Sequence, residues 1–166
     1  MSEKLAVLFV CLGNICRSPM AEAAFRAECA RRNLEINCDS VGIGDWHEGQ
    51  SPDPRACDVA KAHGVDIEGH KARQIREKDF YHYDLVLGLD REITDDLKRL
   101  SPPGAPAHVD LLMNYVHGKV GTSVPDPYYG GAQEFDDVWA MVAQAARALT
   151  DRLTEDAVPE KMAAAK

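Results

Sequence analysis

An unbroken apolar run at residues 5–10, LAVLFV, constrains the fold most, because a helical pattern follows it closely, after the polar stretch CLGNICR. A continuous apolar run of this length is typical of a strand buried on both faces, as in a parallel sheet. Ser18 suits the N-cap of the helix, Pro19 suits its first turn, and the helix extends toward Arg31. The chain therefore begins with a buried strand, a loop and a helix.

The same order of strand and helix is repeated along the rest of the chain. We predict further strands at residues 36–41, 84–89 and 107–112, and further helices at 55–63, 90–100 and 135–153. This alternation predicts an α/β fold, with a single-domain four-stranded parallel sheet flanked by helices on both faces. Ligands of such folds bind at the carboxyl ends of the strands, where residues 11–17 lie.

Composition restricts the compartment and the partners. No apolar run is long enough to span a membrane, and the first residues lack the features of a signal peptide, so we expect a cytoplasmic protein without membrane insertion. The formal net charge of −8 disfavours nucleic acid as a partner. The five cysteines, an odd number in a chain of 166 residues, favour reduced thiols over disulfides. Their spacing gives no C-x2-C pair of the kind that binds zinc.

The stretch CLGNICRS has the residues of a phosphate cradle that contains a nucleophile. A helix N-terminus and a guanidinium favour a thiolate, so Cys11 is placed for activation. Gly13 and Asn14 tolerate positive φ best, which lets the chain curl until its N–H groups converge on an anion. Arg17 can close the ring, because its planar fork matches two phosphate oxygens.

This stretch has two other possible interpretations. Cys11 could be a small buried hydrophobic residue at a strand end, but this leaves Asn14 and Arg17 unexplained. A nucleotide-binding P-loop is excluded, because GNICRSP lacks the second glycine and the lysine of that motif.

Three stretches together, VLFVCLGNICRSPMAEA, DSVGIGDWHEGQSPDPRA and VPDPYYGG, resemble the low-molecular-weight protein tyrosine phosphatases from about residue 6 to about residue 149. The resemblance implies hydrolysis of phosphotyrosine through a phosphocysteine, with no metal and no other cofactor, on a flavodoxin-like sheet. It also implies a phosphatase domain at residues 1–157, and we expect a disordered tail at 158–166.

The resemblance assigns roles to individual residues. It makes Cys11 the nucleophile, Arg17 the phosphate clamp and Asp126 the general acid and base. Ser18 would donate a hydrogen bond to the Cys11 sulfur, and Ser40 would support Asn14. The expected substrate-binding residues are Leu12, Gly13, Asn14, Ile15, Cys16, Ser18, Trp46, Tyr128 and Tyr129.

Other residues near these motifs have simpler interpretations. Asp126 alone, between two prolines, could merely begin a turn, and Trp46 and Tyr129 could be packed against loops instead of lining an aromatic cleft. The lone histidines His47 and His108 are expected at the surface or in the core, not on a metal. The acidic residues at 90–96 are expected to be the solvated start of a helix.

Three functions remain open from sequence alone. A tyrosine phosphatase would act on a tyrosine-phosphorylated protein, as a monomer or weak dimer. An arsenate reductase of the same fold would need two later cysteines, whereas every cysteine lies at or before Cys57. A non-catalytic phosphate-binding module would not need both Cys11 and Asp126.

Cys16 suggests a redox function. The loop should bring Cys11 and Cys16 within disulfide distance, so that Cys16 could rescue Cys11 after oxidation by peroxide. The simpler interpretation is that Cys16 only packs beneath the loop.

Overall fold

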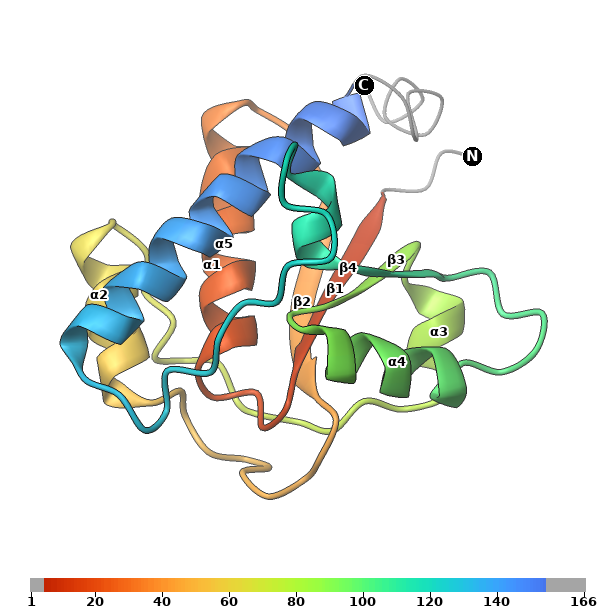
Figure 1. Ribbon diagram of the computed structural model, residues 1–166, viewed down its shortest axis with the longest axis horizontal. Helices are drawn as coiled ribbons and strands as arrows, with labels where there is room; N and C mark the ends of the chain where they lie inside the picture. The colour runs from red at the N-terminus through yellow and green to blue at the C-terminus, as the bar shows by residue number, and fades with distance from the viewer. Residues whose placement is uncertain (1–4, 155–166) are drawn as a thin grey trace.

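The chain folds into three layers, with a sheet between two sets of helices (Figure 1). The computed structural model describes residues 5–154. In chain order, its elements are β1 (Ala6–Cys11), α1 (Arg17–Arg31), β2 (Asn37–Gly42), α2 (Pro54–Ala62), α3 (Asp79–His82), β3 (Leu85–Gly88), α4 (Arg91–Leu100), β4 (His108–Leu111), the 3₁₀ helix η1 (Leu112–Tyr115) and α5 (Ala132–Arg152).

The predicted α/β fold is confirmed. Among the described residues the sheet has four parallel strands in the order β2-β1-β3-β4, and each predicted strand end lies within one residue of the observed end. After β1 the chain forms β2 on one side of it and later β3 on the other side. The carboxyl end of β1 is therefore a topological switch point, which in open parallel sheets is where ligands bind.

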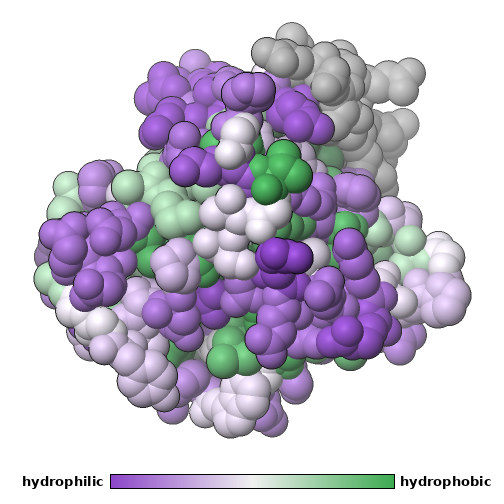
Figure 2. Space-filling model, viewed as in Figure 1, coloured by the Kyte–Doolittle hydropathy of each residue, from purple (hydrophilic) through white to green (hydrophobic). Residues whose placement is uncertain are grey.

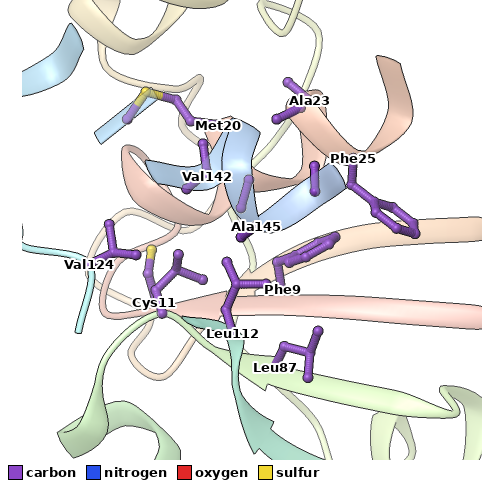
Figure 3. Close-up of a cluster of buried hydrophobic side chains, with 14 of the residues drawn as sticks. Phe9, Cys11, Met20, Ala23, Phe25, Leu87, Leu112, Val124, Val142 and Ala145 are labelled. Carbon is purple, nitrogen blue, oxygen red and sulfur yellow. The ribbon is translucent and has the colours of Figure 1, made fainter. Parts of the chain in front are cut away.

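The core has two parts, one on each face of the sheet. Successive side chains of a strand point to opposite faces, so Val7 and Phe9 join a cluster with α1, α2 and α5. Leu8 and Val10 join a smaller cluster with Phe80 and other residues near α3 and α4. Figure 3 shows the larger cluster, in which α1 and α5 lie over the central strand.

The helical period predicted near the C-terminus is confirmed. All of its apolar positions are buried on α5 or just after it: Phe135, Val138, Trp139, Val142, Ala146, Leu149 and Leu153. The predicted tail at 158–166 lies outside the described residues.

One prediction about the first helix is wrong. Helix α1 begins at Arg17, so Ser18 lies inside it, and no side chain caps the helix. The Ser18 hydroxyl is instead directed at the loop, where its Oγ lies 3.0 Å from the Cys11 sulfur. The local capping preference of serine is overridden by this long-range contact.

Hydrophilic residues cover most of the face shown in Figure 2, with small apolar areas between them. Within residues 5–154, none of the helices combines the length and the apolar character that a membrane span requires.

Candidate active site

Cys11 ends the central strand, at the switch point of the sheet. Its side chain is buried, and its sulfur lies 3.3 Å from the main-chain nitrogen of Asn14 and 3.0 Å from Oγ of Ser18. Both groups can donate a hydrogen bond to an anionic sulfur. The fold therefore places a thiol among donors at its ligand-binding edge.

The loop between β1 and α1 curls around this sulfur. Asn14 has a φ of 62°, as predicted, but Gly13 does not take a positive φ, so that part of the prediction is wrong. A Cβ at Gly13 would lie 2.8 Å from Cδ2 of His47, so a larger residue there would displace the His47 ring from its present position in the cleft wall. Within the described part of the chain, the main-chain N–H groups of Gly13, Ile15 and Cys16 have no hydrogen-bond partner, which leaves them for an anion.

A hydrogen-bond network beneath the loop holds the side chain of Asn14. Its Nδ2 donates to Oγ of Ser18 at 2.8 Å and to Oγ of Ser40 at 3.0 Å. Its Oδ1 accepts from the main-chain nitrogen of Arg73 at 3.2 Å and lies 3.0 Å from Nε2 of His70. All polar atoms of this buried amide are thus satisfied, which stabilises the positive φ at Asn14.

Sequence reasoning missed His70 and Arg73 as partners of Asn14. They lie 56 and 59 positions after Asn14, in a loop that runs beside the end of β2. Such long-range contacts leave no periodic pattern in the sequence, so no signal in this chain alone could have identified them.

Arg17 is buried at the start of α1 and is held from two sides. Its Nη1 donates to Oδ2 of Asp90 at 2.7 Å and to the carbonyl of Val124 at 3.0 Å, and Nη2 lies 3.8 Å from Oδ2 of Asp126. Burial opposes the charged form, but the Cys11 sulfur and the two carboxylates outweigh it, so the pKa of Arg17 lies above its ordinary value. Arg17 is therefore a fixed cation facing Cys11.

The expectation that residues 90–96 are only a solvated helix start is wrong for Asp90. Its Oδ1 caps α4 by accepting from the nitrogen of Ile93 at 2.7 Å, and its Oδ2 binds Arg17. An aspartate directly after a buried parallel strand lies at the ligand-binding edge of the sheet, and this was the signal that could have identified it.

Asp126 lies across the cleft from the loop. Its Oδ1 accepts from the main-chain nitrogen of Tyr128 at 3.1 Å, and Pro125 and Pro127 restrict the chain on both sides. The side chain is 42% exposed, so it can reach both a ligand and water.

These residues surround a cleft of about 370 Å³. Three residues expected at the site, Asn14, Ser18 and Ser40, do not line it. They are buried beneath the loop and support it. The cleft is lined by Cys11, Leu12, Gly13, Ile15, Cys16, Arg17, Trp46, His47, Asp126, Tyr128 and Tyr129.

Aromatic side chains form the mouth of the cleft. Trp46 is 64% exposed and Tyr129 is 94% exposed, and both line the cleft. His47, which was expected at the surface or in the core, lines the same cleft. Its ring centroid lies 6.5 Å from that of Tyr128. The walls are therefore suited to a planar group bound above Cys11.

Cys16 also borders the cleft but is buried. Burial, with smaller contributions from Asp53, Cys11 and Asp126, raises the pKa of the Cys16 thiol well above its ordinary value. Cys16 therefore stays protonated at neutral pH. All five cysteines are free thiols.

Within residues 5–154, one group of side chains could hold a metal ion: Glu22, Asp39 and His70, whose ligand atoms lie within 4.8 Å of one another. It lies beneath the loop, outside the cleft, and its carboxylates are already paired with Arg26 and Arg73. Nothing in this group reaches Cys11.

Comparison with known proteins identifies relatives over almost the whole chain. A sequence model of the low molecular weight phosphotyrosine protein phosphatases matches residues 6–159. A low molecular weight phosphotyrosine protein phosphatase of Schizosaccharomyces pombe is 42% identical over 145 residues, which cover 86% of this chain and 92% of that protein.

Solved structures show the same fold. A protein tyrosine phosphatase from Entamoeba histolytica superimposes with a TM-score of 0.86 at 33% identity, over 92% of this chain and 98% of the other. The Drosophila arginine phosphatase DARP superimposes with a TM-score of 0.86 at 30% identity, over 95% of this chain and 100% of the other. Some proteins similar to this chain are therefore named as tyrosine phosphatases, and one is named as an arginine phosphatase.

Proposed function

Because this chain belongs to the low molecular weight phosphotyrosine protein phosphatase family, and is therefore a phosphatase, we propose that it hydrolyses phosphotyrosine through a phosphocysteine at Cys11. One observation carries the proposal: a thiol and a fixed guanidinium from one loop, and a carboxyl group from a distant segment of the chain, line one cleft. A nucleophile, an anion clamp and a proton donor are what phosphoryl transfer to a side chain requires.

In the first step, the thiolate of Cys11 attacks phosphorus. An S–P bond forms while the bond from phosphorus to the phenolic oxygen breaks. Arg17 and the free N–H groups of the loop bind the phosphoryl oxygens, where negative charge is concentrated. Asp126 gives its proton to the departing phenolic oxygen, and tyrosine leaves as a neutral phenol.

In the second step, water attacks the phosphocysteine. Asp126, now a carboxylate, accepts a proton from the water as its oxygen bonds to phosphorus. The S–P bond breaks, and Ser18 stabilises the thiolate of Cys11, since its hydroxyl lies 3.0 Å from the sulfur. Inorganic phosphate is released and the thiolate is restored.

The walls of the cleft favour an aromatic substrate. Trp46 and Tyr128 can contact the faces of a phenyl ring, while the buried sulfur lies at the base of the cleft. We infer that the substrate is a phosphotyrosine in a protein, exposed enough for its ring to enter the cleft.

The alternatives considered from sequence are less well supported. An arsenate reductase needs further cysteines near the nucleophile, but of the five cysteines only Cys11 and Cys16 line the cleft. A binding module has no use for a carboxylate facing a dianion, because Asp126 would repel the ligand. The free state of all five thiols supports a cytoplasmic location. The oligomeric state is a separate prediction, and we propose a monomer or weak dimer.

The test is hydrolysis of phosphotyrosine and of phosphoarginine by the purified protein with EDTA present. We expect EDTA-resistant release of phosphate from phosphotyrosine, inhibited by inorganic phosphate and by vanadate. Faster release from phosphoarginine would overturn the proposed substrate while leaving the chemistry at Cys11 in place.

A further inference from the structure

The loop that carries Asp126 is fixed to the protein on both sides of this residue. On its N-terminal side, the nitrogen of Val124 donates to the carbonyl of Leu89 at 2.9 Å, and the carbonyl of Val124 accepts from Arg17 at 3.0 Å. This first attachment lies two positions before Asp126.

Arg55 provides the second attachment, on the C-terminal side. From the first turn of α2 its Nη2 donates to the carbonyl of Tyr128 at 2.9 Å, and its Nη1 donates to the carbonyl of Gly130 at 2.8 Å. Its guanidinium also lies 4.5 Å from the ring centroid of Phe135 and 5.8 Å from that of Tyr128. Arg55 thus contacts both the main chain of the loop and the aromatic side chain of Tyr128.

Asp53 fixes the orientation of this guanidinium and connects it to the phosphate loop. Its carboxylate accepts from Nε of Arg55 at 3.0 Å and from Nη2 at 2.9 Å. Its main-chain nitrogen donates to the carbonyl of Ile15 at 2.8 Å. A continuous chain of hydrogen bonds therefore runs from the loop around Cys11, through Asp53 and Arg55, to the loop that carries Asp126.

An ordinary helix cap would explain only part of this arrangement. Asp53 already caps α2 by accepting from the nitrogen of Arg55 at 2.9 Å, and this cap does not need the guanidinium. The donors of the guanidinium that face away from Asp53 could be in water, since the Arg55 side chain is 37% exposed. They are directed instead at two carbonyls of one loop, a geometry that the single ammonium of lysine cannot reproduce.

We propose that Arg55 is a positioning residue for the general acid: it holds the 126–130 loop so that Asp126 lies within reach of the leaving oxygen. The inference rests on the proposed role of Asp126. Proton transfer needs a contact of hydrogen-bond length, and a displacement of about 1 Å can cost about 100-fold in rate. Arg55 therefore acts on the departure of the leaving group and not on phosphate binding.

The test compares kcat/KM for two substrates in the parent, Arg55→Ala, Arg55→Lys and Lys61→Ala. Phenyl phosphate needs a proton on its leaving oxygen, whereas 2,4-dinitrophenyl phosphate does not. For Arg55→Ala we expect a loss of about 10- to 100-fold on phenyl phosphate and less than about 3-fold on the dinitrophenyl ester. Arg55→Lys should recover only part of the loss, and Lys61→Ala, an exposed change on the same helix, should match the parent.

Two further measurements separate this function from a general effect on folding. The inhibition constant of inorganic phosphate should be unchanged in Arg55→Ala, because the phosphate loop stays intact. In the double variant Arg55→Ala/Asp126→Ala, activity on phenyl phosphate should equal that of Asp126→Ala, because there is no acid left to position. An equal loss on both esters, a weaker affinity for phosphate, or additive losses would overturn the inference about Arg55.

The Asp126→Ala variant alone tests the premise. If it loses activity equally on both esters, the proposed role of Asp126 is wrong, and the inference about Arg55 is overturned with it. If Asp126→Ala shows the expected dependence on the leaving group and Arg55→Ala does not, only the inference about Arg55 is overturned.

Discussion

Oδ2 of Asp90 accepts a hydrogen bond of 2.7 Å from Nη1 of Arg17, so a carboxylate 73 positions away orients the guanidinium that faces the cleft. The other oxygen of Asp90 is used differently, because it caps α4 at Ile93. One side chain thus connects the start of a helix on one face of the sheet with the anion clamp on the other. These two functions can be separated by mutation.

We expect Asp90→Asn to lower kcat/KM by about 10- to 100-fold while leaving the protein folded. Asparagine is a good N-cap, so its one amide oxygen can still accept from Ile93. The NH₂ group of the asparagine would then face Arg17, and because both groups are donors, no hydrogen bond could form between them. Steady-state kinetics with urea unfolding measures both effects. Asp90→Ala should show the same loss of activity and a further loss of about 1 kcal/mol in stability from the missing cap.

Cys11→Ser should abolish turnover, because a serine hydroxyl in this loop is a far weaker nucleophile than a thiolate. Binding of inorganic phosphate, measured by calorimetry, should persist, since Arg17 and the loop N–H groups are unchanged. Turnover retained by this variant would rule out the phosphocysteine.

Asp126→Ala should lose about 10²- to 10⁴-fold in kcat/KM on phosphotyrosine, the usual range for acid catalysis. The loss should shrink on esters whose alcohols leave readily as anions, because they need no proton. A series of aryl phosphates measures this dependence. A loss that is constant along the series would show that Asp126 is structural.

Asp53 predicts a pH dependence of stability. Hydrogen bonds from Arg55, which outweigh burial, hold the pKa of Asp53 below its ordinary value. A lowered pKa stabilises the folded state above the unfolded pKa of about 4, and the stabilisation is lost as the pH falls through the lower folded value. Asp53→Asn should therefore be less stable than the parent at pH 7, and the two should converge in strongly acidic solution.

Urea unfolding at several pH values measures this convergence. Asp58→Asn, an exposed change on the same helix, is the matched control and should show a smaller difference from the parent. A difference between parent and Asp53→Asn that stays constant down to the acidic limit would contradict the prediction.

The strands and most helices could be predicted because local patterns determine them. The run at residues 5–10 is apolar throughout, and β1 is buried throughout. Helix α3 could not be predicted in this way, because it has four residues and no room for a helical period. It depends on Asp79, which is buried and accepts from the nitrogen of Arg76 at 2.8 Å and from the guanidinium of Arg73.

The same distinction holds at the site. Cys11 and Arg17 belong to one short motif, so the sequence predicted that they meet. The partners that hold this motif in place, Asp90, His70 and Arg73, come from distant segments, and only the folded chain brings them together. Ser18 shows that local rules can also mislead, because its hydroxyl is used at Cys11 and not as a helix cap.

Reversible inactivation by peroxide is the last prediction, and it depends on Cys16. Both Cys11 and Cys16 line the cleft, so peroxide that enters it reaches both thiols. Burial raises the pKa of Cys16, which keeps it a thiol and directs oxidation to Cys11. Peroxide would convert the Cys11 thiolate to a sulfenic acid, and Cys16 would displace water from it to form a disulfide.

We expect peptide mapping after brief treatment with peroxide to recover Cys11 joined to Cys16, and dithiothreitol to restore activity. A Cys16→Ser variant cannot form this bond, so its Cys11 should proceed to sulfinic acid and its activity should not return. Cys57→Ser is the matched control, because Cys57 lies outside the cleft and its replacement should leave recovery unchanged. Full recovery of Cys16→Ser under thiol would mean that Cys16 only packs beneath the loop.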